Sequence, residues 1–549
     1  MSRSGARMRA LLPAAADYRP LRRSWRGDLL AGLTVGIVAL PLALGFGISS
    51  GAGAEAGIVT AIVAGVVAAL FGGSNVQVSG PTGAMVVVLA PIVASHGLGA
   101  VAVVSLLAGV IVLVAGALRL GRAVSFIPWP VIEGFTLGIA VIIFLQQLPA
   151  LTRADAGGAS HTNVALTAVD ALAHADAGYL LWGLGAVGIV AGCMILLPRL
   201  HRSIPGSLVG IVVVTVLALV LPTPLADIGE LPRTLPMPVL PALDLAMLGQ
   251  LAVPALTVAA LAAIESLLSA RVAASLADTG PYDPDRELVG QGLASIAAGV
   301  FGGMPATGAI ARTAVNVRAG ARTRLASVSH AVVLLLVVLV AAHPVGLIPL
   351  AALSGVLMVT AVRMVHLATV RSILRSTRAD AVAFIVTAIV TISVDLIVAV
   401  VIGMVVAGVF AIRGLSRATG VTREALAGDP VEGDERIALI RLDGPLFFAP
   451  ADRVFDAVTA LDGVSVVILR MSQLELVDAT GAHVLSEIVR RLEARGITVL
   501  IKGVREGHLE LFRSVGVLAA LRDHRHLFAS LPDAVEHARR HVARERATG

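Results

Sequence analysis

Two polar interruptions in long apolar stretches carry most of the chemistry that this sequence offers. The first break is VQVSGPTGAMVVVL, residues 76–89, and the second break is GGMPATGAIARTAVNV, residues 302–317. A helix that begins inside a membrane exposes four unpaired N–H groups and the positive end of its dipole. Such an end must be buried in protein or line a cavity. Two such ends that meet near the middle of the bilayer would form an anion-binding site.

Small residues and hydroxyls in the breaks suit this role. Thr82 and Thr307 supply hydroxyl donors, and Gly80, Gly83 and Gly308 let the backbone approach a ligand closely. A single break of this kind would be explained as a packing contact between membrane helices. Two breaks at matching places in a duplicated sequence favour a binding site instead.

Two charged residues lie inside apolar segments, where a charge is costly and marks a functional candidate. Arg312 belongs to the second break, and its guanidinium could lie near a bound anion, pair with a carboxylate or reach the inner membrane face. Glu265 lies about midway along the segment 251–276. A bound anion beside it favours a protonated carboxyl, so we predict that Glu265 couples transport to protons. The alternative is a permanent ion pair with Arg312.

The composition indicates an integral membrane protein. The chain has 549 residues, of which 57% are hydrophobic and 14% charged, whereas soluble proteins carry about 25% charged residues. The net charge of +6 comes from short Arg clusters without interleaved aromatic residues, so it does not indicate nucleic-acid binding. The sequence has no metal-ligand cluster, phosphate loop or nucleophile elbow. We therefore expect neither a cofactor nor an enzymatic activity.

Apolar segments divide residues 28–415 into about fourteen membrane segments, some of them shorter than the ~20 residues needed to cross a bilayer. The expected cores are 28–48, 56–72, 82–95, 99–118, 125–147, 179–197, 205–221, 251–276, 287–303, 307–319, 325–342, 347–370, 379–396 and 397–415.

Arginine residues set the expected orientation, because loops that carry Lys and Arg stay in the cytoplasm. Residues 1–27 are rich in arginine, and alternate loops then hold Arg119 and Arg122; Arg199 and Arg202; Arg271 and Arg286; Arg318, Arg322 and Arg324; and Arg371, Arg375 and Arg378. We expect a multi-pass protein of the plasma membrane with both termini in the cytoplasm.

The membrane part is internally duplicated. FGGSNVQVSGPTGAM at 71–85 and FGGMPATGAI at 301–310 share Phe-Gly-Gly, then Pro, then Thr-Gly-Ala. They fall in the third and tenth segments. Because these segments are seven apart, an odd number, the second half crosses the membrane in the opposite direction to the first. Inverted repeats with interrupted segments at matching positions are typical of secondary transporters with a site at the membrane midplane.

The composition changes after the last apolar segment. Residues 416–435 are polar and typical of a linker, and residues 436–549 alternate between strand-like and helix-like patterns. This predicts a small cytoplasmic α/β domain.

These residues resemble the SulP family of sulfate-permease-like anion transporters, and the tail resembles a STAS domain. The resemblance rests on VSGPTGAMVVVLAPIV, AAIESLLSARVA and DPDRELVGQGLASIAAGVFGGMPATGAIARTAVNVRAGARTRLA. It implies a seven-plus-seven inverted repeat, core and gate subdomains that move in an elevator-like manner, and a homodimer. Carried over by position, the anion site comprises Ala39, Leu42, Phe46, Thr82, Gly83, Glu265, Thr307, Gly308, Ala309 and Arg312.

Departures from the family narrow the expected function. Ala39 and Leu42 stand where several eukaryotic relatives have Gln, and Arg312 stands where sodium-driven bicarbonate relatives tend to lack an Arg. We therefore expect proton-coupled symport of sulfate, bicarbonate or a dicarboxylate. The alternatives are an uncoupled anion channel or exchanger, a membrane sensor, and a nucleobase permease of the same fold, which would not use Arg312 or a STAS tail.

Thr480, in VDATGAH, is similar in position to the serine that is phosphorylated in anti-sigma-factor antagonists. A regulatory phosphosite is one interpretation. We expect instead that the Thr480 hydroxyl caps the following helix.

Overall fold

The computed structural model describes residues 11–548 except 19–20, 123–126, 153–162, 202–203, 242–243, 277–279, 281 and 395. The chain divides into two compact units between Met404 and Val405. The larger unit is helical, and the smaller one combines a sheet with helices. The mostly helical membrane domain and the small α/β domain predicted from the sequence are both confirmed.

Each of the fourteen predicted segments overlaps a helix, and the segment 347–370 also extends into a second helix. The fourteen helices are α2 (Leu21–Ser49), α3 (Ala54–Phe71), α4 (Gly83–His96), α5 (Gly99–Ala117), α6 (Trp129–Gln146), α9 (Ala177–Leu200), α10 (Gly206–Val220), α11 (Leu245–Leu276), α12 (Pro284–Val300), α13 (Ile310–Arg318), α14 (Arg324–Gly346), α15 (Leu350–Met364), α17 (Arg378–Ser393) and α18 (Leu396–Ala418).

Within the described residues, nine helical stretches are long and apolar enough to cross a membrane. The helices that start at the breaks, α4 with 14 residues and α13 with 9, are shorter than a full crossing.

Three short helices were not predicted as separate elements: α7 (Leu148–Thr152), α8 (Val164–Ala173) and α16 (Leu367–Arg375). The predicted segment 347–370 is wrong at its C-terminal end, because α15 stops at Met364 and the extended Val365 separates it from α16. Polar and basic residues in α16 make it amphipathic rather than uniformly apolar, so hydropathy alone does not delimit it.

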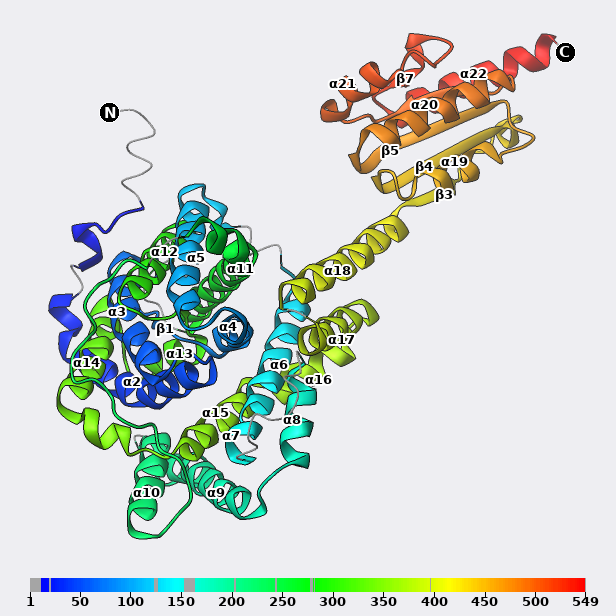
Figure 1. Ribbon diagram of the computed structural model, residues 1–549. Coiled ribbons are helices and arrows are strands. Elements are labelled where there is room, and N and C mark those ends of the chain that lie inside the picture. The colour runs from blue at the N-terminus through cyan, green and yellow to red at the C-terminus, as the bar shows by residue number, and fades with distance from the viewer. Residues whose placement is uncertain are drawn as a thin grey trace. The chain divides into compact units, whose positions relative to one another are not determined.

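The membrane helices form two bundles (Figure 1). Helices α2–α5 pack with α11–α14, whereas α6, α9 and α10 pack with α15 and α17. Glycines allow close packing in the first bundle: a Cβ on Gly292 of α12 would lie 2.5 Å from the backbone nitrogen of Leu113 in α5. The first bundle corresponds to the expected core subdomain and the second to the gate.

The smaller unit is a five-stranded sheet in the order β3-β4-β5-β6-β7, comprising β3 (Gly420–Glu424), β4 (Ile437–Leu446), β5 (Val466–Val477), β6 (Thr498–Lys502) and β7 (Leu527–Phe528). Strand β3 runs antiparallel to β4, and the remaining pairs are parallel. One face of the sheet shares its apolar core with α19 (Ala451–Thr459), α20 (Ala479–Ala494) and α21 (Glu506–Val515), and the other with α22 (Leu531–Thr548).

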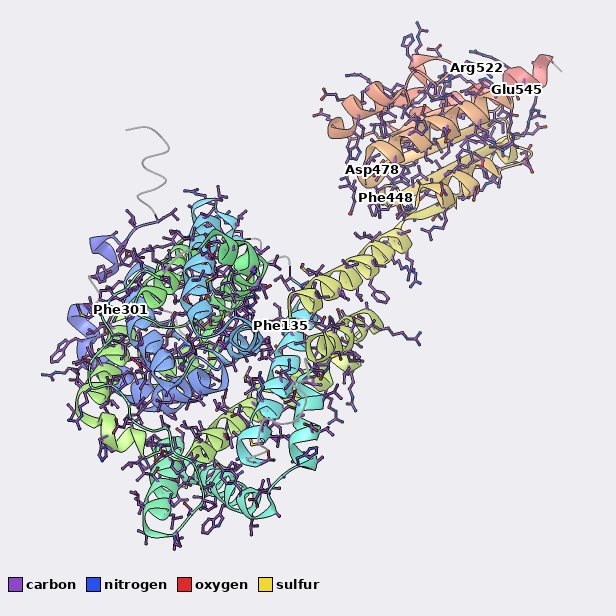
Figure 2. The ribbon with its side chains drawn as sticks, in the orientation of Figure 1. Phe135, Phe301, Phe448, Asp478, Arg522 and Glu545 are labelled. Carbon is purple, nitrogen blue, oxygen red and sulfur yellow. The ribbon has the colours of Figure 1, made fainter. Side chains whose placement is uncertain are left out.

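The start of α20 corrects the expectation for Thr480. The Oδ1 atom of Asp478 accepts a hydrogen bond from the backbone nitrogen of Gly481 at 2.7 Å and caps the helix. Figure 2 shows Phe448 beside Asp478, whose Oδ2 also accepts the N–H of Phe448 at 3.3 Å. Thr480 is exposed in the first turn. The predicted capping role of its hydroxyl is therefore wrong.

Glu424 links edge strand β3 to the sheet. Its two oxygens accept hydrogen bonds from Arg441 at 2.7 Å and Arg470 at 2.8 Å. Burial raises the pKa of the Glu424 carboxyl, but the bonds and charges of the two arginines outweigh burial, so this pKa lies below its ordinary value. The ion pairs therefore stabilise β3 above about pH 4.5, and this contribution disappears as the pH falls through the lowered pKa.

We expect Glu424→Gln to speed amide exchange of residues 420–424 about fivefold at neutral pH, which corresponds to about 1 kcal/mol. In strong acid the variant and the wild type should exchange alike. Glu475→Gln, a change at an exposed position of β5, is the matched control. A variant-to-wild-type ratio that does not change with pH would contradict the assigned role of the carboxylate.

Candidate functional site

The two breaks meet inside the core bundle. Strand β1 (Ser79–Gly80) pairs antiparallel with β2 (Thr307–Gly308), so residues more than two hundred positions apart form one ladder. Figure 1 shows β1 surrounded by the helices of this bundle. Helix α4 begins three residues after β1, and α13 begins two residues after β2. The ladder therefore brings the N-terminal ends of both half-helices to one place.

Neither half-helix has a side-chain cap within the described part of the chain. Thr82 is the N-cap residue of α4 and Ala309 that of α13, and in both helices the first turn lacks a side-chain acceptor. Their leading N–H groups also lack partners within their own helix. Ile310, which begins α13, is 39% exposed. The residue that begins α13 is thus partly accessible, and the dipole makes this helix start electropositive.

A carboxylate joins the two breaks. The hydroxyls of Thr82 and Thr307 lie 2.7 and 2.8 Å from Oε2 of Glu265, and they lie 3.1 Å from each other. Thr307 is fully buried and Thr82 is 7% exposed. Glu265 keeps part of its surface accessible. The structure therefore brings together three side chains that the sequence singled out separately.

Some backbone donors of the second break are already used. The N–H of Gly308 donates to Oγ of Ser266 at 3.0 Å, and the N–H of Ala309 donates to the carbonyl of Val78 at 2.9 Å. Ser266 follows Glu265 in α11. Helix α11 therefore holds the second break while it presents its carboxylate to both breaks.

Arg312 points behind the first break. Its side chain is 2% exposed, which excludes the interpretation that it reaches the membrane face. The Nη2 atom donates to the carbonyl of Pro81, and Nη1 is buried without a partner among the described residues. No ion pair within 4.0 Å joins Arg312 to Glu265 in the described structure, so the predicted alternative of a permanent pair finds no support. A Cβ on Gly80, whose φ is 154°, would lie 2.8 Å from Nη1.

The three site residues expected on α2 form an apolar surface. Ala39, Leu42 and Phe46 are 0%, 7% and 6% exposed. Phe46 approaches the start of α4, because its Cε1 would lie 3.4 Å from a Cβ on Gly83. The same Cβ would lie 2.1 Å from Cδ1 of Ile143 in α6. Gly83 thus marks a contact between the core and gate bundles.

The sequence interpretation missed a second buried carboxylate. Glu287 of α12 accepts hydrogen bonds from the side chains of Gln77 and Gln291, both at 2.9 Å. A signal was present, because RELVGQG places an acid and an amide inside an apolar segment.

Gly308 offers a test of the packing at the second break. A Cβ there would lie 1.8 Å from Nε2 of Gln77 and 3.1 Å from Cα of Ser266. Overpacking of this kind costs about 1–3 kcal/mol, so we expect Gly308→Ala to lower Vmax/KM for anion uptake at least about tenfold. The control is Gly185→Ala in α9, where a Cβ would have no neighbour within 4 Å. Equal losses in both variants would contradict a specific role for Gly308.

The fold and the site define a class of protein: a membrane transporter built from an inverted repeat, with two half-helices that face each other. The sulfate permease family profile matches residues 25–387, and the STAS domain profile matches residues 430–534. The chain belongs to the sulfate permease family and carries a STAS domain.

Known proteins agree with this assignment. The chain is 36% identical over 519 residues to the putative sulfate transporter YvdB of Bacillus subtilis, covering 90% of this chain and 94% of that protein. It is 31% identical to the transmembrane domain of the cyanobacterial bicarbonate transporter BicA, with a TM-score of 0.61 over 70% of this chain and 98% of that one.

Murine Slc26a9, an anion transporter solved in the inward-facing state, matches with a TM-score of 0.84 at 19% identity, over 97% of this chain and 95% of that one. At this identity the likeness concerns the fold. The chain is a multi-pass membrane protein of an anion-transporter family.

Proposed function

We propose that the protein is a secondary active transporter of small anions that works by proton-coupled symport. One observation carries the proposal: a single oxygen of Glu265 contacts Thr82 and Thr307, the hydroxyl residues of the two breaks. An anion bound between the starts of α4 and α13 would lie beside this carboxyl. An ionised Glu265 would repel an anion bound beside it, so anion binding is favoured when the carboxyl takes up a proton.

The hydroxyl partners make proton uptake by Glu265 compatible with the geometry. A threonine hydroxyl donates one hydrogen bond and can also accept, whereas an N–H group only donates. When Glu265 takes up a proton, Thr82 and Thr307 can turn their hydroxyl hydrogens toward the anion. Anion and proton therefore favour each other's binding, and the symport follows from this reciprocity.

Arg312 supports the anion through its charge. Its guanidinium is buried, and no carboxylate lies within 4.0 Å of it among the described residues. A buried cation without an ion-pair partner is costly. An anion between the two half-helices would reduce that cost while adding to the field of the helix ends.

Alternating access in this proposal is elevator-like. The core bundle carries both breaks, α11 and Arg312, so it would carry the anion as one body past the gate bundle. The contact between Gly83 and Ile143 lies between these bundles. We further propose that the protein is a homodimer. Both termini would lie in the cytoplasm, in agreement with the distribution of arginine along the loops.

The substrate class follows from relatives rather than from spacing. YvdB is named as a putative sulfate transporter and BicA as a bicarbonate transporter. We propose sulfate, bicarbonate or a dicarboxylate for this protein. Exposed Thr480 in the first turn of α20 is a candidate phosphosite, where a helix N-terminus would stabilise the added charge.

The test is uptake by purified protein in liposomes, with sulfate, bicarbonate, fumarate and a nucleobase offered separately under an imposed proton gradient. We expect uptake of at least one anion, faster when the outside is acidic. Uptake without any gradient effect would indicate an uncoupled channel or exchanger. Uptake of a nucleobase and of no anion would favour the permease alternative.

A further inference from the structure

Helix α12 carries a second carboxylate, and it is almost completely buried. Glu287 is 1% exposed. Its Oε2 accepts the backbone N–H groups of Gly73 and Ser74 at 2.8 and 3.1 Å. Its Oε1 accepts the side-chain amides of Gln77 and Gln291, both at 2.9 Å. In the described part of the chain no cation lies within ion-pair distance of it, so four N–H donors balance its charge.

The types of donor separate Glu287 from Glu265. All four donors to Glu287 are N–H groups, two from the backbone and two from the side-chain amides of Gln77 and Gln291. A proton on Glu287 would have to displace one of these donors or reverse one of the amides, and either change disturbs a buried network. The partners of Glu265 are hydroxyls, which can reverse their roles. In this arrangement Glu287 accepts four hydrogen bonds from groups that are fixed by the loop and by α12, whereas the hydroxyl partners of Glu265 can reverse their roles by rotation alone.

The bonds of Glu287 lead to both breaks. Nε2 of Gln291 also donates to Oγ of Ser79 at 2.6 Å. Ser79 belongs to β1, where it pairs with Gly308 of β2. Gln77, held by Glu287, lies directly against Gly308, as the 1.8 Å approach to a Cβ there shows. One carboxylate thus fixes the segment before α4 and, through two amides, the segment before α13.

Glu287 supplies a charged acceptor to the loop before β1, which Asn316 and Ser327 also hold by donating to the carbonyls of Val76 and Gln77 at 2.8 and 2.7 Å. A Cβ on Gly73 would lie 1.9 Å from the carbonyl of Asp283, so this loop lies directly on the start of α12. Hydrogen bonds to an ionised acceptor are about twice as strong as neutral ones. Because the loop leads directly into β1, this acceptor contributes to the direction in which α4 begins.

We propose that Glu287 is a positioning residue of the anion site: its buried carboxylate, through Gln77 and Gln291, aligns the two half-helix ends that receive the anion. This inference rests on the proposed anion site. It assigns Glu287 no contact with the anion and no proton. Supporting residues of this kind set how precisely a binding geometry is held.

The test replaces Glu287 by Gln and follows two readouts in the full-length protein. Gln at position 287 keeps one oxygen as an acceptor, but its NH₂ group replaces the other oxygen and faces N–H donors that it cannot accept. We expect KM for the transported anion to rise at least about tenfold, with a smaller change in Vmax. Amide exchange of residues 72–86 and 305–312 should rise by a similar factor. The control is Asp285→Asn on the same helix, whose Oδ1 instead accepts the N–H of Gly121 at 3.0 Å.

Two further variants keep the test decisive. Gln291→Met keeps the charge of Glu287 and removes the link to Ser79, so it should raise KM even if Glu287→Gln does not fold. The double variant Glu287→Gln/Gln77→Glu restores a contact between an amide and a carboxylate. Its KM should lie at least halfway back from that of Glu287→Gln to that of the wild type.

The outcomes separate this inference from the proposed function. If KM is unchanged and exchange rises evenly along the chain, Glu287 only stabilises the fold and the positioning role is overturned. If amide exchange of both breaks in Glu287→Gln matches that of the wild type, the positioning role is overturned as well. Amide exchange needs no transport, so faster exchange confined to the breaks supports the alignment even when the wild type moves none of the anions.

Discussion

Glu265→Gln is expected to abolish the stimulation of anion uptake by an inward proton gradient. Gln has nearly the same shape, and its carbonyl oxygen can still accept the hydroxyls of Thr82 and Thr307, which lie 2.7 and 2.8 Å from Oε2 in the wild type. The amide cannot gain or lose a proton, so it imitates the protonated carboxyl permanently. Anion binding should persist, while uptake becomes independent of pH in proteoliposomes.

The matched control for this variant is Glu133→Gln. Glu133 lies in α6, where its Oε1 accepts the indole N–H of Trp129 at 3.1 Å, away from both breaks. That variant should keep the full response to the gradient. If Glu265→Gln retains a normal dependence on pH, the coupling role of Glu265 is rejected, whereas the anion site between the half-helices remains open to test.

Arg312→Met is expected to reduce Vmax/KM for the anion at least about a hundredfold, the factor for about 3 kcal/mol. The guanidinium is buried, and its Nη2 holds the carbonyl of Pro81 directly before Thr82. Met fills a similar volume but removes both the charge and this bond. Arg312→Lys should recover part of the loss, because it restores the charge without the planar fork of donors. Initial uptake rates over a range of anion concentrations give Vmax and KM for the wild type and both variants.

Arg318 lies on the same helix and provides the control. It is exposed near the end of α13, and Arg318→Met should change uptake little. A normal KM in Arg312→Met would show that the charge of Arg312 does not reach the anion. A loss of Vmax alone, recovered by no substitution, would instead indicate that the residue only stabilises the fold of the core bundle.

The sequence predicts the helices of this protein well and the contacts of its polar residues poorly. The segments around Thr82 and Thr307 were recognisable because their Pro and Gly residues interrupt apolar runs. Their pairing as one ladder was not, because pairing between segments so far apart depends on how all the intervening helices pack. Glu287 illustrates the same difficulty: its residue type marked it as unusual, but only its four partners show what it does.

The orientation of Arg312 shows where sequence reasoning ends. Its position in an apolar segment was enough to make it a candidate, but three orientations were consistent with that position. The structure buries the guanidinium behind Pro81, because Gly80 leaves room for it there. Asp478 gives a second case in the smaller unit, since it takes the capping position that the sequence interpretation assigned to Thr480.

By itself, the sequence determined the approximate positions of fourteen apolar helices, the two breaks and the resemblance to the family. These features depend on local chemistry: the transfer free energy of side chains and the backbone preferences of Pro and Gly. Only the tertiary structure decided that Glu265 faces hydroxyls and Glu287 faces N–H groups. That difference arises from which distant segments are packed together, and the roles proposed here, proton coupling for Glu265 and positioning for Glu287, rest on it.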